Sequence, residues 1–153
     1  MSLMSSLNIS ASGMSAQRTR MDIISQNVAN VNTTRDENGE AYRRRTVVFE
    51  ERSNANKNFE SYLTAQQTGL SYDRRIGTGV KITSIVEDHV TSMKKVYEPS
   101  HPDADEEGYV TYPNVNTVTE MTNLIDANRS YEANVTAFNA TKNMALKGLE
   151  LGS

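Results

Sequence analysis

The two histidines are the side chains best suited to proton transfer near neutral pH, and the 153 residues hold no others. His89 and His101 do not share a metal-binding spacing such as His-x-x-x-His. A hydrolytic triad would also need a serine and an aspartate beside one of them, and no feature of the sequence brings such a set together. We therefore expect no catalytic site, and we interpret His101, between Ser100 and Pro102, as a turn residue.

Acidic and glycine-rich stretches could hold a metal or a nucleotide, but both patterns are incomplete. The acidic run at 103–108 resembles the start of a calcium loop, yet Asn114 occupies the position that requires a bidentate glutamate. Gly77-Thr78-Gly79 is followed by Ile82 where a dinucleotide site needs a third glycine. The chain has no cysteine, which excludes thiolate ligands. We expect no cofactor, no metal and no small-molecule substrate.

A basic run, Tyr42 to Arg45, raises the question of nucleic acid. The net charge of −3 and the nearby Glu50 and Glu51 instead favour a salt-bridging surface strand, so we expect no nucleic-acid partner. No segment approaches the roughly 20 apolar residues of a membrane span, so we expect no direct membrane insertion. The N-terminal stretch lacks the basic start and compact apolar block of a secretory signal, so any export would proceed without a cleaved signal peptide.

The first segment has the periodicity of an amphipathic helix. Its apolar residues recur at steps of three, four or seven, which places them on one helix face. Gly13 weakens this helix by about 1 kcal/mol relative to alanine. The predicted stripe consists of Leu3, Leu7, Ala11, Met14, Met21, Ile24, Val28 and Val31.

The last segment repeats this design. Thr117 to Glu120 has the form of a capping box, with a hydroxyl at the N-cap and a glutamate three residues later. The residues that follow alternate steps of three and four, which is a heptad seam. The predicted seam consists of Met121, Leu124, Asn128, Tyr131, Val135, Phe138, Lys142, Ala145 and Leu149.

The middle of the chain has a different character. It holds 25 of the 35 charges, and it contains two strand-like runs at 42–51 and 79–88. Residues 53–70 fit either a loop or a weak helix. We therefore divide the chain into an N-terminal helix (1–34), an outward-facing β-containing insert (35–112) and a C-terminal helix (113–153).

The fold class that follows is mainly α, with the terminal helices paired as a coiled coil and a small β-containing or irregular insert between them. Aromatic residues make up only 7% of the chain, so we do not expect a large core. Neither helix can bury its stripe on the small insert alone. The helices must pair with each other, with copies of themselves, or with both, so we expect a chain that folds by association.

Both ends of the chain carry a recognisable signature. The stretch from Ala11 to Gln17, followed by that from Ser25 to Thr33, closely resembles the N-terminal signature of bacterial flagellar rod and hook proteins. The stretches from Asn114 to Met121 and from Asn128 to Asn134 resemble the matching C-terminal signature, which includes Arg129 and Glu132. The run VYEPSHPDADEEGYVTYPNVN is similar to that of the proximal-rod members of this family.

The resemblance implies a structural, non-enzymatic subunit of the flagellar basal body. Such proteins are exported unfolded and polymerise into a hollow rod that crosses the periplasm, transmits torque and surrounds the export channel. The implied partners are copies of the chain, other rod proteins, membrane-ring components and the export apparatus. The alternative is a soluble secretion-linked adaptor or chaperone built as a helical hairpin.

The asparagines of the two helices suggest a role in register. A buried asparagine lowers stability but fixes alignment and partner, so we expect Asn27 and Asn128 to hydrogen-bond across neighbouring helices. The alternative is that Asn27 and Asn30 only cap the first helix, since asparagine accepts the left-handed conformation that ends helices.

This hypothesis predicts the effect of Asn128→Leu. The substitution should strengthen association, because an apolar side chain replaces a polar one, while allowing more than one alignment between subunits. Rod geometry in electron micrographs and swimming motility are the measurements. Unchanged geometry together with unchanged motility would show that Asn128 does not set the register.

Overall fold

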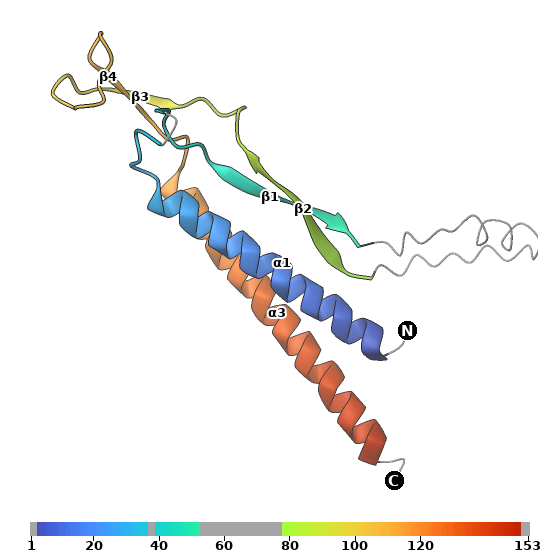
Figure 1. Ribbon diagram of the computed structural model, residues 1–153. Helices are drawn as coiled ribbons and strands as arrows, with labels where there is room; N and C mark the ends of the chain where they lie inside the picture. Colours follow the sequence, from blue (N-terminus) through green and yellow to red (C-terminus); the bar gives the residue numbers. More distant parts are fainter. Residues whose placement is uncertain (1–2, 37–38, 53–77, 151–153) are drawn as a thin grey trace, which may run out of the picture.

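Two long helices, one at each end of the chain, dominate the molecule (Figure 1). The structure is a computed structural model that describes residues 3–36, 39–52 and 78–150. Helix α1 runs from Leu3 to Ala29 and helix α3 from Thr117 to Glu150. The mainly α architecture with a small β-containing insert is thereby confirmed. None of the helices in the described residues is both long enough and apolar enough to cross a membrane.

The two predicted strands are present, each slightly shorter than expected. Strand β1 spans Arg45–Glu51 and strand β2 spans Val80–Glu87, and the two pair antiparallel. The ambiguous segment 53–70 lies outside the described residues, as does Gly77.

A β-bulge interrupts strand β2. Val48 pairs with Ser84, but the next residue, Phe49, pairs with Ile82. Thr83 is therefore the extra residue on β2, and the adjacent residues Ile85 and Val86 beyond it are both exposed.

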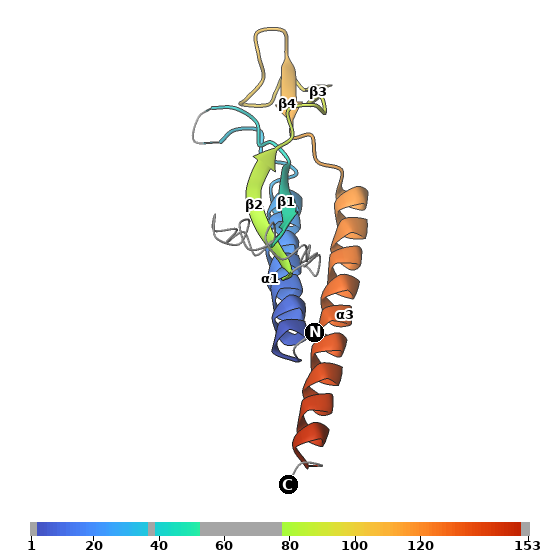
Figure 2. The same ribbon diagram turned by 90° about the vertical axis from the view of Figure 1, so that its right-hand side faces the viewer.

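A second small sheet lies beyond the first. Strand β3 (Lys94–Tyr97) pairs antiparallel with β4 (Tyr109–Tyr112). Val110 is fully buried, and the rings of Tyr97 and Tyr109 meet edge to face with their centroids 5.3 Å apart. Figure 2 shows this sheet at the far end of the molecule from the two chain termini.

Helices α1 and α3 lie side by side and antiparallel. Asn27 near the end of α1 bonds Glu120 near the start of α3. Gly13, nearer the start of α1, lies against Asn134, nearer the middle of α3. The β1–β2 sheet packs on α1 and not on α3, so α1 lies between the sheet and its partner helix (Figures 1 and 2).

The apolar core is small, as the composition predicted. Only six apolar residues of the described chain are buried, and three of them are alanines. Most large apolar side chains therefore remain partly or fully exposed in the single chain. The buried apolar residues are Ala16, Ile23, Ile24, Ala41, Val110 and Ala127.

The end of α1 differs from the prediction. No non-glycine residue of the described chain has a positive φ, so neither Asn30 nor Asn32 adopts the left-handed conformation. Asn30 instead donates from its backbone N–H and from its side-chain Nδ2 to the Gln26 carbonyl oxygen. The Gln26 carbonyl oxygen therefore accepts two hydrogen bonds from Asn30 at the end of the helix.

The start of α3 also differs. The N-cap is Asn116 rather than Thr117, because Asn116 Oδ1 accepts hydrogen bonds from the backbone N–H groups of Val118 and Thr119. The predicted capping box is wrong: the Glu120 side chain turns toward Asn27 on α1. Gly152 follows the predicted seam, and glycine is a typical helix stop, but this residue lies outside the described residues.

Gly79 is the glycine that the packing of β2 on α1 requires. Its φ is +118°, a conformation that side chains disfavour, and a Cβ on this residue would overlap Ser12 Oγ. Ser12 Oγ also accepts a hydrogen bond from the Val80 backbone N–H at 3.1 Å. The sheet therefore approaches α1 closely at this point.

We predict that Gly79→Ala destabilises the chain by about 1–3 kcal/mol, because it combines backbone strain with a steric clash. Denaturant unfolding measures this loss. Gly148→Ala is the matched control, since a Cβ there meets no atom within 4 Å and alanine favours a helix by about 1 kcal/mol. If Gly79→Ala proves as stable as the control, the close approach is wrong.

Candidate assembly interface

Asn27, fully buried near the end of α1, is the centre of a polar junction between the helices and β1. Its Nδ2 donates to the Arg45 carbonyl oxygen at 2.8 Å and to Glu120 Oε2 at 2.9 Å. Its Oδ1 accepts from the Arg45 backbone N–H and from the Tyr42 hydroxyl, both at 2.9 Å. One side chain thus joins both helices to the start of the sheet.

Glu120 is the buried charge of this junction, with 1% of its surface exposed. Its Oε1 accepts from Arg44 Nε at 2.9 Å and from Arg44 Nη2 at 2.8 Å, while its Oε2 accepts from Asn27. A buried carboxylate requires such a partner, because desolvation strongly disfavours an unpaired charge. The residues come from α1, α3 and the segment entering β1.

Asn114 extends the junction to the segments beyond β2. Its Oδ1 accepts from the Arg44 backbone N–H at 2.8 Å, and its Nδ2 donates to the carbonyl oxygens of Asp88 and Thr91. Arg44 also lies 3.9 Å from Asp88. The Thr91 backbone N–H and hydroxyl hold the pKa of Asp88 below its usual value, so this carboxylate is anionic at neutral pH.

Tyr42 closes one side of the junction. Burial raises the pKa of its hydroxyl, an effect that the positive charge of Arg45 partly offsets. Arg45 itself turns outward and pairs with Glu87 on β2 at 3.1 Å, so the predicted salt-bridging strand is confirmed for this residue. Arg44, in contrast, points inward to the buried Glu120.

These polar groups hold the fold together rather than perform a reaction. The hydrogen-bonding atoms of Asn27 and the carboxylate of Glu120 are occupied by other parts of the chain. Within the described residues, no three histidine or acidic side chains gather as metal ligands. The acidic turn at 103–108 uses its carboxylates internally: Asp103 accepts from the Thr34 hydroxyl, and Asp105 accepts from two backbone N–H groups.

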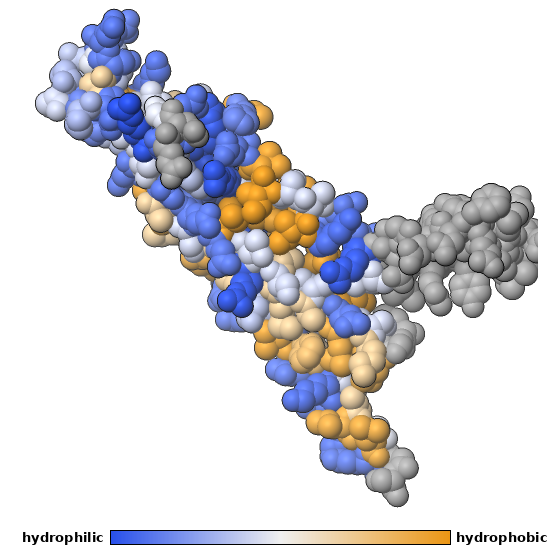
Figure 3. Space-filling model, in the orientation of Figure 1, coloured by the Kyte–Doolittle hydropathy of each residue, from blue (hydrophilic) through white to orange (hydrophobic). Residues whose placement is uncertain are grey.

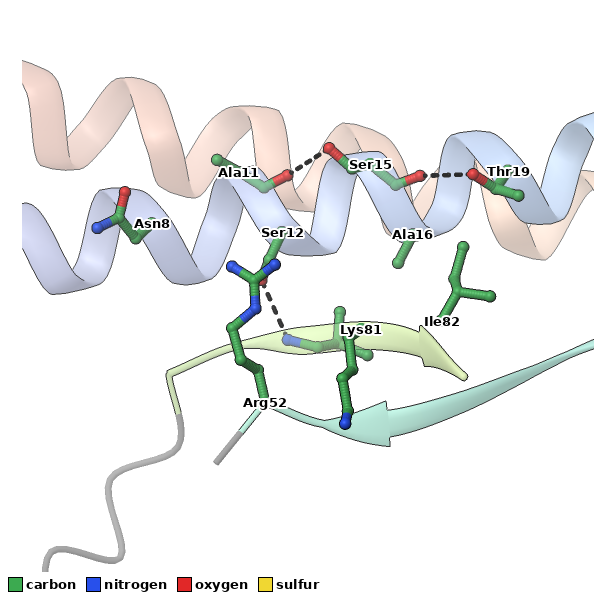
Figure 4. Close-up of a pocket in the computed structure, with 10 residues that line it drawn as sticks. Asn8, Ala11, Ser12, Ser15, Ala16, Thr19, Arg52, Lys81 and Ile82 are labelled. Atoms are coloured by element: carbon green, nitrogen blue, oxygen red, sulfur yellow. Dashed lines mark hydrogen bonds between the residues drawn. The ribbon is translucent and has the colours of Figure 1, made fainter. Parts of the chain in front are cut away.

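A groove of about 360 Å³ runs between α1 and β2 (Figure 4). Its helical wall consists of small residues such as Ala11, Ser15 and Ala16. Figure 4 shows the Arg52 side chain lying toward Ser12, whereas Lys81 points away from the helix. The small side chains allow the sheet to approach α1, so this groove belongs to the packing of the sheet.

The buried positions of α3 in its contact with α1 are small or polar residues, not the large apolar residues of the predicted seam. The row of α3 that faces α1 repeats every seven residues, and the predicted row 121, 128, 135, 142 and 149 lies one position, about 100°, further around the helix. The observed row faces Gly13 and Asn27. It consists of Glu120, Ala127, Asn134 and Thr141, of which three are buried and Asn134 is half-buried.

Two of the predicted apolar rows lie beside these buried positions, whereas Leu124, Tyr131 and Phe138, each four positions after a member of the observed row, lie close to it and are half-buried. On α1, the apolar row at positions 7, 14, 21 and 28 lies one residue after the row that contains Asn27. On α3, the apolar row at positions 121, 128, 135, 142 and 149 likewise lies one residue after the row that contains Glu120. Because the helices are antiparallel, these equal offsets turn both rows toward the same side of the pair. We call this side the apolar flank. Ser12, which touches β2, lies one position in the other direction, so the sheet occupies the other side.

The exposure of the predicted residues follows from this geometry. Ile24 and Asn27 are buried, whereas Leu3, Met121, Asn128, Arg129, Glu132 and Leu149 are exposed. The others are half-buried: Leu7, Met14, Met21, Val28, Asn30, Leu124, Tyr131, Val135 and Phe138.

Comparison with known proteins identifies the family. The model of the flagella basal body rod protein family matches residues 7–35, and that of the C-terminal part of flagellar basal body rod FlgEFG proteins matches 106–151. The chain is 48% identical to the flagellar basal-body rod protein FlgC of Bacillus subtilis, with 96% of each chain covered. It is 41% identical to FlgC of Borreliella burgdorferi, over 99% of this chain and 98% of that protein. It is also 37% identical to FlgC of Salmonella typhimurium, with 99% of each covered.

The chain belongs to the family of flagellar basal-body rod proteins. This family is structural, so the chain is not an enzyme, as the sequence predicted. The two matched regions of the rod-protein family contain the two sides of the junction, Asn27 and Glu120. They also contain the α1 and α3 rows of the apolar flank.

The hypothesis that asparagines set the helix register has a different outcome for Asn27 and for Asn128 of this rod-family chain. Asn27 does bond a neighbouring helix, but that helix is α3 of the same chain. Asn128 is exposed on the flank side and donates to Glu132 Oε1 at 3.1 Å. Its role between subunits of the rod therefore stays a prediction.

The sequence reasoning missed the pairing of Arg44 with Glu120. Arg44 was placed on an exposed strand and Glu120 in a helix cap. One sequence feature could have indicated a buried role for Glu120: it is an isolated charged residue directly before a seam that has few charges. The position of its partner, 76 residues away, follows only from the tertiary structure.

We predict that Glu120→Gln destabilises the chain by about 2–3 kcal/mol, because Arg44 would lose its buried counter-charge. The matched control is Glu87→Gln, which removes the exposed pair with Arg45 and should cost less than about 1 kcal/mol. Urea unfolding of both variants is the measurement. Equal losses would show that the buried junction has no special weight.

Proposed function

We propose that this rod-family chain is a subunit of the proximal rod that polymerises with copies of itself and with other rod proteins into a hollow axial tube. The tube crosses the periplasm, transmits torque and surrounds the export channel. The terminal helices form its inner coiled-coil layer, and residues 35–112 face outward. The chain reaches this position without a cleaved signal peptide.

The apolar flank is the observation that supports this proposal. Two stripes from opposite ends of the chain lie on one side of the helix pair, and the sheet packs on the other side. In the described part of the chain, Leu7, Met14, Met21 and Val135 remain half-exposed on this flank. Burying one such side chain stabilises an interface by about 1.5–3 kcal/mol at most, so each neighbouring subunit provides a substantial gain.

The polarity of the α1–α3 contact suits the same function. A helix pair held by small and polar residues gains little from its own apolar contacts, so isolated helices of this kind are marginal. A subunit of this kind orders fully when neighbours cover its flank, as in folding coupled to binding. A loosely held chain is also the form that an export channel can thread.

The secretion-linked adaptor is the second candidate. It would use the same half-exposed flank to hold an exported partner and would then be released from it. The two functions differ in where the chain ends up: a subunit stays in the finished rod, whereas an adaptor does not.

We predict that the paired substitution Met14→Glu and Val135→Glu abolishes rod assembly and motility in a host that lacks its own copy of the gene, because charges on the flank would be buried between subunits. Purified basal bodies, probed for the chain, are the readout.

The control is Ala133→Glu, an exposed position of α3 turned away from the flank, which should preserve rods. Circular dichroism of the variants in solution tests whether both fold alike. If cells that express the wild-type chain build functional rods in which this chain is not found, the subunit proposal is contradicted and the adaptor is favoured.

A further inference from the structure

The β3–β4 sheet is set apart from the rest of the molecule. In the described part of the chain, neither of its strands comes close to another helix or strand. Figure 3 shows this end of the molecule, at the upper left, mostly in the blue of hydrophilic residues, with orange apolar areas further down. The position of the sheet relative to the helices therefore depends on contacts made by the connecting segments.

On one side, the sheet faces the segment that follows α1 across an open groove. The groove has a volume of about 430 Å³, and both residues 34–43 and the β3–β4 unit line it. Polar contacts across the groove converge on Asp103. Its Oδ2 accepts from the Thr34 hydroxyl at 2.8 Å, and its Oδ1 lies 3.7 Å from Nη1 of Arg35, whose side chain is 67% exposed. Exposed ion pairs of this kind add little stability.

On the other side, Asn114 joins the two connections of the sheet. It lies between β4 and α3, and its Nδ2 donates to the carbonyl oxygens of Asp88 and Thr91, which lie between β2 and β3. Its Oδ1 accepts from the Arg44 backbone N–H at 2.8 Å. The Asp88 backbone N–H donates to the Arg44 carbonyl oxygen, also at 2.8 Å. Both connections of the sheet are therefore bonded to the backbone of Arg44.

The side chain of Arg44 points the opposite way, into the junction between the helices. Its Nε and Nη2 donate to Glu120 Oε1 at 2.9 and 2.8 Å. Glu120 in turn accepts from Asn27 of α1 through its Oε2. The third guanidinium nitrogen of Arg44 lies 3.9 Å from the Asp88 carboxylate. One residue thus contacts the helix pair through its side chain and the connections of the sheet through its backbone.

We propose that Arg44 couples the pairing of α1 with α3 to the position of the β3–β4 sheet, so that loosening either one loosens the other. A coupling of this kind is reciprocal, because each site changes the free energy of the other by the same amount. The planar guanidinium suits the role, since it holds a carboxylate in a defined geometry. The inference goes beyond the proposed function and concerns contacts within one chain, so it can fail while the subunit function holds.

Single cysteines in this cysteine-free chain report on the two ends of the coupling. Val110→Cys reports opening of the sheet and Ala127→Cys reports opening of the helix pair, because both side chains are fully buried. The rate at which a maleimide labels each thiol is measured on the purified full-length chain. Thr136→Cys, exposed on α3, gives the rate for an accessible thiol.

Substitutions at either end should affect the reporter at the other end. Asn114→Ala removes the bonds to the connections of the sheet, and we expect it to raise the labelling rate of Ala127→Cys about fivefold, the lower end of typical coupling between two sites. Glu120→Gln should raise that of Val110→Cys by a similar factor. The two substitutions together should raise either rate by less than the product of their separate effects, because both act through Arg44.

Thr34→Ala is the matched control. It removes the hydrogen bond to Asp103, which holds the sheet without involving Arg44. We expect this substitution to raise the labelling rate of Val110→Cys and to leave that of Ala127→Cys unchanged.

Other results would overturn the proposal. If Asn114→Ala raises the labelling of Val110→Cys alone, the sheet and the helices are independent. If Thr34→Ala raises the labelling of Ala127→Cys as much as Asn114→Ala does, both reporters follow global unfolding and not a link through Arg44.

The reporters carry their own checks. Equal labelling rates for Ala127→Cys and Thr136→Cys in the otherwise unchanged chain would remove the helix pairing from which the coupling starts. If circular dichroism shows that a reporter variant does not fold, Ala41→Cys replaces Val110→Cys and Thr141→Cys replaces Ala127→Cys, since both of these positions are also buried.

Discussion

The structure depends on one buried carboxylate. Glu120 is held between Asn27 of α1 and Arg44 at the start of the sheet, and the three residues come from segments far apart in the sequence. Hydrogen bonds to a buried charge require a defined geometry, whereas apolar contacts allow helices to slide and rotate. The junction therefore fixes how the two helices and the sheet lie relative to one another, although the apolar core is small.

That small core has a consequence for assembly. A chain that buries only six apolar side chains in its described part leaves most of its larger ones partly or fully exposed. The row of small and polar residues takes the buried positions between α1 and α3, so the predicted apolar rows at 7–28 and 121–149 lie on the flank. The chain thus combines a specific internal alignment with a partly exposed apolar surface. This combination suits a member of the rod-protein family, whose copies must align in a regular structure.

The small residues serve the same arrangement. Gly13 allows Asn134 to lie close to α1, and Gly79 allows β2 to approach Ser12. These contacts bring α1 close to both of its neighbours, so it becomes the central element of the molecule. The cost in intrinsic helix stability at Gly13 is about 1 kcal/mol, and the close packing of α1 offsets it. The rod subunit is therefore ordered around α1, while α3 extends beyond it.

The sequence by itself determined the elements of this protein. Apolar periodicity placed both helices, β-branched runs placed β1 and β2 but not β3 and β4, and the terminal signatures placed the chain among flagellar rod proteins. These features are local, so periodicity and composition reveal them. Only the tertiary structure decided which side of each helix meets the other. The sequence favoured the apolar rows, but the buried positions of α3 are one position away from the predicted row that begins at Met121, and they include Glu120, which bonds Asn27. The buried charge of Glu120 is paired with Arg44, which is 76 residues away in the sequence. Helix periodicity describes only neighbouring residues, so it cannot predict such a pairing.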